Sequence, residues 1–225
     1  MKLTIVAATG GIGRQVLEQA VAEGHDVTAV VRDPSRLAAP VRAVTADLTA
    51  ADLPALSAAL REAVLGADAV LSGLGPRSSA EAGVASRGTE AILEAATAAG
   101  VRRVVVVSAA PIGTVPSPGR PHPPKHDPGD RFLMRHLLGP LIKAALRSHY
   151  ADLARMEDLL RASALDWTAV RPPRLTDKPL TGTYRTAYGR NLRGGLFVSR
   201  ADVAHYMLRA PGEPGSVKQT VGIAN

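Results

Sequence analysis

Short hydrophobic runs alternate along this chain with longer stretches in which apolar residues recur every three or four positions. Short apolar runs bounded by turn residues are typical of buried strands, and the longer pattern is typical of amphipathic helices. The predicted strands cover residues 3–8, 27–31, 41–46, 67–73, 101–107 and 166–170, and the predicted helices cover 14–22, 51–65, 80–99 and 150–162. This alternation predicts an α/β fold with a doubly wound parallel sheet.

The valines at 104–107 form the most continuous β-branched run in the chain. A strand that is apolar on both faces is buried on both faces, so this run is predicted to lie inside the sheet. Doubly wound sheets bind ligands beyond the carboxyl ends of their strands. The candidate site is therefore formed by the residues that follow the predicted strands: 9–13, Arg32, Asp47, 74–77 and Ser108.

Three later segments depart from this alternation. Residues 111–130 hold seven of the 17 prolines and form a predicted loop, either a lid over the site or a surface excursion. Residues 131–147 are an apolar helical stretch with basic residues, expected to pack on the body or at a subunit contact, with a membrane-surface helix as the alternative. Residues 174–198 are a predicted excursion on the substrate side of the fold, and residues 182–198 within it are predicted to form a hairpin. A helix capped by Ser199 and a strand near 217–223 are predicted to follow.

The composition suits one globular domain. With 225 residues, 46% of them hydrophobic, the chain can bury a proper core, and we expect a single domain over 1–225 with a small C-terminal annex. The net charge of +7 is scattered rather than gathered in runs, which favours acidic small molecules over nucleic acid as partners.

The absence of Cys and the pattern of the N-terminal residues exclude further kinds of site and segment. The absence of Cys excludes disulfides, thiolate catalysis and Cys-based metal sites, and no metal site is predicted. Met1 runs straight into the first strand without a signal-peptide pattern, and no apolar run is long enough for a membrane span. We expect a cytoplasmic protein, a monomer or a small homo-oligomer.

The first strand ends in a glycine turn, Thr9-Gly10-Gly11-Ile12-Gly13, and a helix follows. Glycines at such a turn let the backbone bend sharply and let a pyrophosphate approach the amides at the helix N-terminus, where the helix dipole favours negative charge. The strand, the helix and a charged residue about twenty positions on are all in register. This unit predicts dinucleotide binding.

The end of the second strand bears on which dinucleotide is preferred. An NAD-preferring fold usually places an acid there to hold the ribose 2′-hydroxyl. This chain has Arg32, with Arg36 one helical turn on, a pair able to grip a 2′-phosphate. Asp33 is an acid close by, so NADP(H) is the preferred cofactor and NAD(H) remains possible.

Residues 7–14 resemble the Gly-Ala-Thr-Gly-x-x-Gly-Arg turn of atypical short-chain dehydrogenase/reductases, in the NmrA-like, NAD(P)H-binding group. Residues 31–37, 172–182 and 199–209 are similar to the matching segments of its biliverdin reductase B, or flavin reductase (NADPH), subgroup. The resemblance implies a Rossmann fold, NADPH as cofactor and flavin as a substrate rather than a prosthetic group. The cofactor contacts expected from the turn, the strand ends and the resemblance are Thr9, Gly10, Gly11, Ile12, Gly13, Arg32, Arg36, Asp47, Leu48, Leu74, Gly75, Arg77, Ser108, Pro172 and Pro173.

For Asp47, a helix cap is the alternative to an adenine contact. Two other positions depart from the family pattern. Ala7 replaces the first glycine of the turn, a change small enough to leave the turn possible. Arg174 stands where the flavin reductases have a histidine in the substrate pocket.

The proton-relay dyad of ordinary short-chain dehydrogenases, a Tyr with a Lys four residues on, is missing. Tyr150 is followed at that spacing by Ala154, and the other register gives His149 and Leu153. Reduction of a simple ketone is therefore disfavoured. A flavin, quinone or biliverdin-like acceptor is favoured, because its conjugated ring spreads the incoming charge and solvent can supply the proton.

The expected function is NADPH-dependent hydride transfer to such an acceptor, planar and anionic. Ser108, Arg174 and Tyr150 are its candidate catalytic contacts. The alternative is a redox sensor of NmrA-like type that binds NADP(H) without turnover. A nucleic-acid or membrane-surface adaptor that uses the basic charge is a third, weaker hypothesis.

Overall fold

The structure is a computed structural model of the chain and describes residues 1–49, 53–75, 81–129 and 146–225. Its strands are β1 (Lys2–Val6), β2 (Asp26–Val31), β3 (Arg42–Thr45), β4 (Ala69–Ser72), β5 (Arg103–Val107), β6 (Asp166–Arg171), β7 (Arg174–Thr176), β8 (Arg185–Tyr188), β9 (Phe197–Ser199) and β10 (Gln219–Ala224). Its α-helices are α1 (Gly11–Ala22), α2 (Leu53–Val64), α3 (Val84–Ala98), α5 (Arg147–Ala162) and α6 (Arg200–Arg209). Short 3₁₀ turns are η1 (Pro34–Arg36), η3 (Ala110–Thr114), η5 (Ala210–Gly212) and η6 (Pro214–Ser216).

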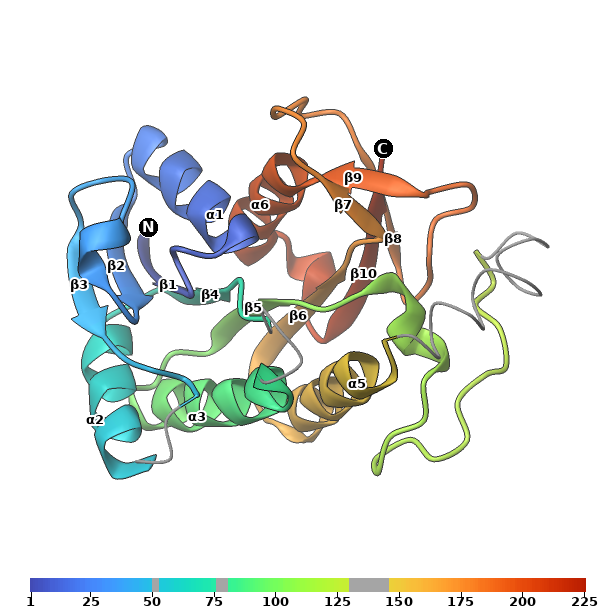
Figure 1. Cartoon of the computed structure of the whole chain (residues 1–225), viewed down its shortest axis with the longest axis horizontal. Coiled ribbons are helices and arrows are strands. Elements are labelled where there is room, and N and C mark those ends of the chain that lie inside the picture. Colours follow the sequence, from blue (N-terminus) through green and yellow to red (C-terminus); the bar gives the residue numbers. More distant parts are fainter. Residues whose placement is uncertain (50–52, 76–80, 130–145) are drawn as a thin grey trace.

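An eight-stranded sheet runs through the centre in the order β3-β2-β1-β4-β5-β6-β10-β8. Its paired strands are parallel, except that β8 runs antiparallel to β10. Helices α1 and α6 cover one face, and α2, α3 and α5 cover the other (Figure 1). The predicted doubly wound sheet is confirmed.

The valine run is an inner strand because both of its faces are covered. β5 lies between β4 and β6, and every one of its residues is buried. Val104 and Val106 belong to the apolar core under α2, α3 and α5, and Val105 and Val107 belong to the core under α1 and α6. Alternate side chains of one strand thus build two cores.

The predicted hairpin at 182–198 is wrong. β7 and β9 pair in parallel as a separate two-stranded sheet, with Arg174 opposite Phe197. β8 instead extends the main sheet by pairing with β10. A tight turn joins only antiparallel strands, so the parallel β7–β9 pair needs the long connection between them.

The helix after this excursion begins where its cap was predicted. The Ser199 hydroxyl accepts a hydrogen bond from the Asp202 amide at 2.9 Å, which satisfies one free amide of the first turn of α6. This cap fixes the start of α6 beside the glycine turn, since α6 packs against α1 in the same core.

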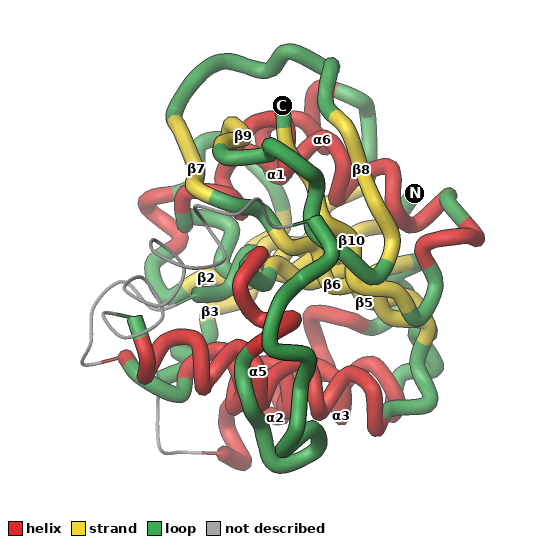
Figure 2. Tube along the Cα trace, turned by 90° about the vertical axis from the view of Figure 1, so that its right-hand side faces the viewer, coloured by secondary structure: helices red, strands yellow, loops and turns green. Residues whose placement is uncertain are grey.

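The proline-rich loop runs down the outside of α5, on the right of Figure 1 and toward the viewer in Figure 2. It is tied to α5 through Asp158, whose carboxylate accepts from the Ser117 hydroxyl at 3.0 Å and from the Gly119 amide at 2.8 Å. Residues 131–147 were predicted to form an apolar basic helix, and residues 131–145 of that stretch lie outside the described residues.

Candidate functional site

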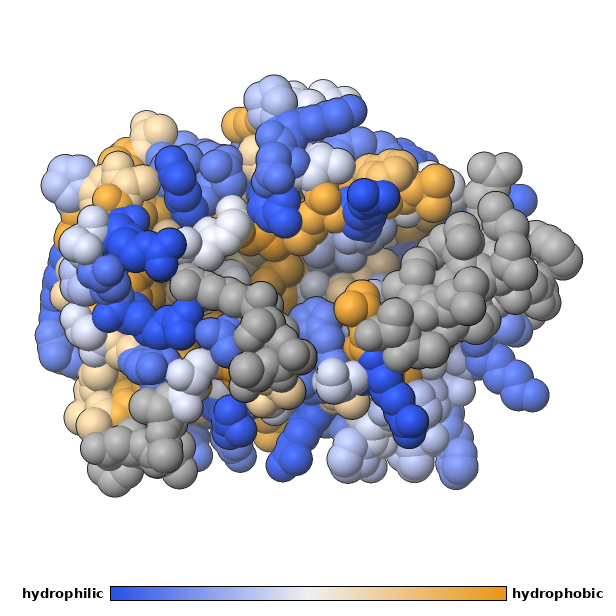
Figure 3. Space-filling view, viewed as in Figure 1, coloured by the Kyte–Doolittle hydropathy of each residue, from blue (hydrophilic) through white to orange (hydrophobic). Residues whose placement is uncertain are grey.

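A cavity of about 320 Å³, here called the main cavity, opens at the carboxyl ends of β1, β2, β4 and β5. Figure 3 shows a hollow across the middle of this face of the molecule, below the β7–β9 unit. The main cavity is lined by Ala7, Thr9, Gly10, Gly11, Ile12, Val30, Val31, Arg32, Ala46, Asp47, Leu48, Thr49, Gly73, Leu74, Gly75, Glu81, Val84, Val107, Ser108, His149, Leu153, Leu175 and Arg200. It lies at the edge of the sheet where doubly wound folds bind their ligands.

The glycine turn presents open backbone amides to the main cavity. Gly10 is the N-cap residue of α1, makes no side-chain cap, and no acid stands in the first turn. The first amides of a helix have no partner within the helix, and the helix dipole adds a partial positive charge there. A pyrophosphate fits such an end.

Close packing explains two glycines of this region. An ideal Cβ on Gly13 would overlap the carbonyl oxygen of Ala7, and one on Gly73 would lie 2.7 Å from the Gly13 nitrogen. Glycine at these positions lets α1 approach the ends of β1 and β4. Gly13, predicted as a cofactor contact, is not among the described residues that line the main cavity.

Arg200, the first residue of α6, reaches the glycine turn and was missed by the sequence analysis. Its Nε would lie 2.8 Å from an ideal Cβ on Gly11, and its Nη1 donates to Asp177 at 2.6 Å. A basic residue in the first turn of a helix opposes the helix dipole, and this unfavourable placement was the available signal. The guanidinium adds a second positive group where a pyrophosphate would lie.

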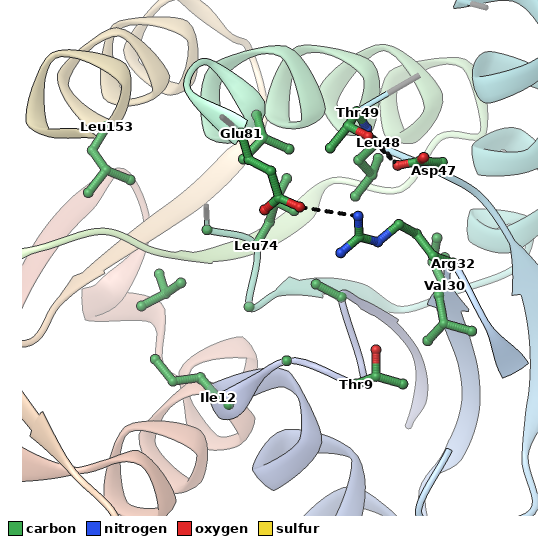
Figure 4. A pocket seen from close by; sticks show the side chains of 18 of the residues that line it. Thr9, Ile12, Val30, Arg32, Asp47, Leu48, Thr49, Leu74, Glu81 and Leu153 are labelled. Atoms are coloured by element: carbon green, nitrogen blue, oxygen red, sulfur yellow. Dashed lines mark hydrogen bonds and ion pairs between the residues drawn. The ribbon is translucent and has the colours of Figure 1, made fainter. Parts of the chain in front are cut away.

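At the opposite end, Arg32 and Glu81 face each other across the main cavity (Figure 4). Arg32 Nη1 donates to Glu81 Oε1 at 3.1 Å, with side-chain exposures of 39% and 19%. Arg32 thus lies where the sequence predicted it. Arg36 is exposed and does not line the main cavity, and Arg77 lies outside the described residues.

Two carboxylates near this end are engaged in local turns. Asp33 accepts from the amide and the hydroxyl of Ser35, and these bonds lower the pKa of its carboxyl. Asp47 accepts from the hydroxyl of Thr49 at 2.7 Å and from its amide at 2.9 Å. These bonds hold the pKa of Asp47 low, with a smaller contribution from Arg32. Asp47 lines the main cavity, as Leu48, Leu74 and Gly75 do.

Ser108 follows β5 and is fixed by a buried ionic network. Its hydroxyl donates to Glu157 Oε1 at 2.7 Å. Arg171 donates to the same oxygen through Nε at 2.8 Å, and Arg161 donates to Oε2 at 2.6 Å. The hydroxyl proton of Ser108 is therefore directed away from the main cavity, while its oxygen can still accept a hydrogen bond.

The helix α5 turns His149, not Tyr150, toward the main cavity. His149 and Leu153, four residues apart on α5, both line it. The Nδ1 atom of His149 is buried and has no hydrogen-bond partner in the described part of the chain. Burial lowers the pKa of His149, partly offset by Asp152.

The other candidate catalytic residues are not brought to the main cavity. Tyr150 is buried in the core under α5, and burial raises the pKa of its phenol. Arg174 is exposed, and its guanidinium lies 5.8 Å from the ring centroid of Phe197. Pro172 and Pro173 are not among the described lining residues, whereas their neighbour Leu175 is.

The described residues form neither a metal cluster nor a membrane-spanning helix. No group of three or more His, Cys, Asp or Glu side chains is arranged to hold a metal ion. No helix in the described part of the chain is long and apolar enough to cross a membrane.

Comparisons with known proteins show the family to which the chain belongs. A 3-diazoavenalumate denitrifying reductase from a Streptomyces species is 40% identical over 116 residues, which are 49% of this chain and 38% of that protein. The chain thus matches well under half of that reductase. An uncharacterised sugar epimerase, YhfK, from Bacillus subtilis is 30% identical over 209 residues, 91% of this chain and 85% of that protein.

A solved structure from Burkholderia pseudomallei, of a protein provisionally described as exported, superposes with a TM-score of 0.75 at 29% identity and covers 100% of both chains. The sequence pattern of the NAD(P)H-binding family matches residues 7–214 of this chain. The match includes the glycine turn, the end of β2 and the helix that carries Arg200. The resemblance in the sequence is confirmed, and the chain belongs to the NAD(P)H-binding family.

Proposed function

We propose that this protein is an NADPH-dependent reductase that passes hydride to a conjugated acceptor such as a flavin, a quinone or a biliverdin-like tetrapyrrole. The observation that carries the proposal is the continuous lining of the main cavity, from Arg32 past the open glycine turn to Ser108 and His149. That order suits the three parts of NADPH, its 2′-phosphate, pyrophosphate and nicotinamide.

The residues present fit this cofactor. The uncapped start of α1 and the guanidinium of Arg200 suit the pyrophosphate. Arg32 suits the 2′-phosphate, and the nearby acid Asp33 already accepts two hydrogen bonds from Ser35. Both bonds end on Oδ1, which leaves Oδ2 of Asp33 able to accept from a ribose 2′-hydroxyl, so the preference for NADP(H) over NAD(H) rests on Arg32.

When bound, NADPH supplies the hydride, and the acceptor also needs one proton to complete its reduction. Ser108 and His149 are the polar side chains at that end of the main cavity. We assign His149 the place next to the acceptor that the sequence analysis gave to Tyr150. An imidazole there can donate a hydrogen bond to a heteroatom that gains charge, and its protonated form can deliver the proton.

The acceptor is proposed to be free to leave, so a flavin would be a substrate and not a prosthetic group. The Streptomyces relative is named as a reductase of 3-diazoavenalumate, which supports a reductase acting on a small molecule here. Arg174, exposed on the β7–β9 unit next to Leu175, is the proposed contact for an acidic group of the acceptor.

A second candidate is a sensor that binds NADP(H) without turnover. The observation that favours it is the orientation of Ser108, whose hydroxyl proton is held by Glu157 at 2.7 Å. A site that cannot donate this proton to a substrate is weaker as a reductase.

Calorimetry with NADPH and NADH, followed by NADPH consumption with FMN, FAD, a quinone and biliverdin, tests the proposal. Binding with consumption supports the reductase, and binding without consumption by any acceptor supports the sensor. The absence of binding of either nicotinamide cofactor would sink both.

A matched pair of variants tests the role of His149. His149→Gln should slow NADPH oxidation, whereas Tyr150→Phe, one position on but in the core, should leave the rate close to that of the wild type. The rate of the wild type should rise as the pH falls below about 6.5, the ordinary pKa of His, and this rise should be absent from His149→Gln. Equal rates and identical pH profiles would remove His149 from the mechanism.

A further inference from the structure

A second cavity of about 380 Å³ lies between the proline-rich loop, α5 and strands β6 and β10 of the main sheet. Its described lining residues are Gly113, Arg120, Pro124, His126, Asp127, Pro128, Arg161, Trp167, Arg171, Gly189, Lys218, Gln219 and Thr220. It shares none of these residues with the main cavity. The loop that the sequence analysis weighed as a lid over the dinucleotide site therefore encloses a different site.

Positive charge converges on this second cavity from three separate elements. Arg161 comes from α5, Arg171 from the end of β6, and Arg120 from the proline-rich loop. Lys218, immediately before β10, is exposed and also lines the cavity. Because these residues come from different elements and loops, the fold brings the four cations to one cavity.

Two of the cations are already neutralised. Arg171 is bound to Glu157 through Nε and Nη2, and Arg161 is bound to Glu157 at 2.6 Å and to Asp158 at 2.9 Å. Asp158 also accepts from the loop, so these two carboxylates have little capacity left for another cation.

Arg120 and Lys218 are not neutralised in this way. The guanidinium of Arg120 and the ammonium of Lys218 make no hydrogen bond or ion pair within the described part of the chain. The pKa of Arg120 is lowered by burial and then by the positive charges of Arg161 and Arg171, which outweigh Glu157 and Asp158. An anion beside Arg120 would relieve this repulsion.

Lys218 is also held in an unusual backbone conformation. Its φ is +55°, in the left-handed region that favours glycine, and its amide donates to the Trp167 carbonyl at 2.7 Å. Such a conformation costs a non-glycine residue about 1 kcal/mol or more. A glycine would avoid this cost, whereas lysine supplies a positive charge beside the cavity.

Asp127 is the carboxylate among the described lining residues, and its hydrogen bonds fix the proline-rich loop in place. Asp127 Oδ1 accepts from the Gly129 amide at 2.8 Å and from the Asn191 amide at 2.9 Å. Asp127 is 7% exposed and makes no ion pair of 4.0 Å or less with the four cations. It therefore shapes the second cavity without cancelling the free charges of Arg120 and Lys218.

We propose that the second cavity binds a small molecule with at least two anionic groups, a polycarboxylate or a compact phosphate, held between Arg120 and Lys218. Trp167 offers an apolar floor to the carbon skeleton of a polycarboxylate. This site does not depend on the function proposed for the main cavity.

Calorimetry with citrate, and separately with pyrophosphate, tests the site on the full chain and distinguishes carboxylate from phosphate ligands. We expect one equivalent of one of them to bind and the affinity to fall about tenfold or more in Arg120→Gln and in Lys218→Gln, since each removes a charge-assisted contact. Arg120→Lys, which keeps the charge, should recover part of the loss. Arg32→Gln, a change in the main cavity, should leave this affinity unaltered.

Two results would overturn the site. One is the absence of binding by either anion to a wild-type protein that is folded by circular dichroism. The other is an affinity that does not fall in the Arg120 and Lys218 variants, which would place the anion outside the second cavity; a fall in Arg32→Gln instead would place it at the Arg32 end of the main cavity. Neither result bears on NADPH consumption, so the function proposed above stands or falls separately.

Discussion

Arg32 Nη1 lies 3.1 Å from Glu81 Oε1, so the residue expected to hold a 2′-phosphate is paired with a carboxylate of the same chain. The pair joins the end of β2 to the start of the α3 region across the main cavity (Figure 4). A 2′-phosphate and Glu81 would compete for one guanidinium, and cofactor preference is then set by the pair rather than by Arg32 alone.

Replacement of Arg32 by Ala should weaken NADPH binding about tenfold or more and NADH binding far less, because only NADPH carries the phosphate that a charge-assisted bond would hold. Calorimetry with both cofactors measures the difference. Equal losses for the two would show that Arg32 does not read the phosphate.

Replacement of Glu81 by Gln should do the opposite and tighten NADPH binding by a few fold. A partly exposed ion pair contributes about 0.2–1 kcal/mol. The 2′-phosphate must break the Arg32–Glu81 pair to bind Arg32, so this free energy is subtracted from NADPH binding in the wild type. NADH affinity is the internal control, since it should change little. Weaker NADPH binding in Glu81→Gln would mean that the pair orients Arg32 for the phosphate.

The turn itself contains a residue in an unfavourable conformation. Ala7 has a φ of +58°, at the position where the family has glycine. Ala7→Gly should raise the free energy of unfolding by about 0.5–1 kcal/mol, because the strain of the left-handed region outweighs the larger entropy of an unfolded glycine. Urea denaturation measures it. The comparison is Gly24→Ala, at φ +74° with open space around an added Cβ, which should destabilise by a similar amount.

His149 makes stability depend on pH. Burial lowers its pKa in the folded state from the ordinary 6.5, so the folded protein binds fewer protons than the unfolded chain once the pH falls below that value. Its contribution to stability is complete above about pH 6.5 and is lost as the pH falls below it. The wild type should therefore lose more stability than His149→Gln between pH 7.5 and pH 5.5, measured by urea denaturation at both. Parallel losses would contradict the shift.

Features that depend on local pattern were predictable from the sequence. The glycine turn follows from residue types at fixed spacing, and the inner position of the 104–107 run follows from valines on both faces of one strand. Arg32 was predictable because the end of a strand is a defined place in this fold.

Features that depend on docking were not predictable. Adjacent residues of a helix point about 100° apart, so the choice between His149 and Tyr150 was decided by how α5 lies on the sheet. Arg200 reaches the glycine turn only because α6 packs against α1, and β8 pairs with β10 across more than thirty residues of chain. Sequence periodicity carries no record of these tertiary contacts.

The buried network around Glu157 should be the most sensitive charged site in the fold. Glu157 is 1% exposed and holds Arg171, 3% exposed, together with Arg161 and the Ser108 hydroxyl. Glu157→Gln leaves the buried guanidinium of Arg171 without its counter-ion, a loss that costs about 3–5 kcal/mol in buried pairs.

The matched control for Glu157 is Glu62→Gln, which breaks the Arg42–Glu62 pair at 3.0 Å, with side-chain exposures of 53% and 63%. That exposed pair should contribute no more than about 1 kcal/mol. Denaturation of both variants gives the comparison. A loss in Glu157→Gln as small as that in Glu62→Gln would show that water or a rearranged side chain compensates Arg171, and that Ser108 is not held rigidly by this network.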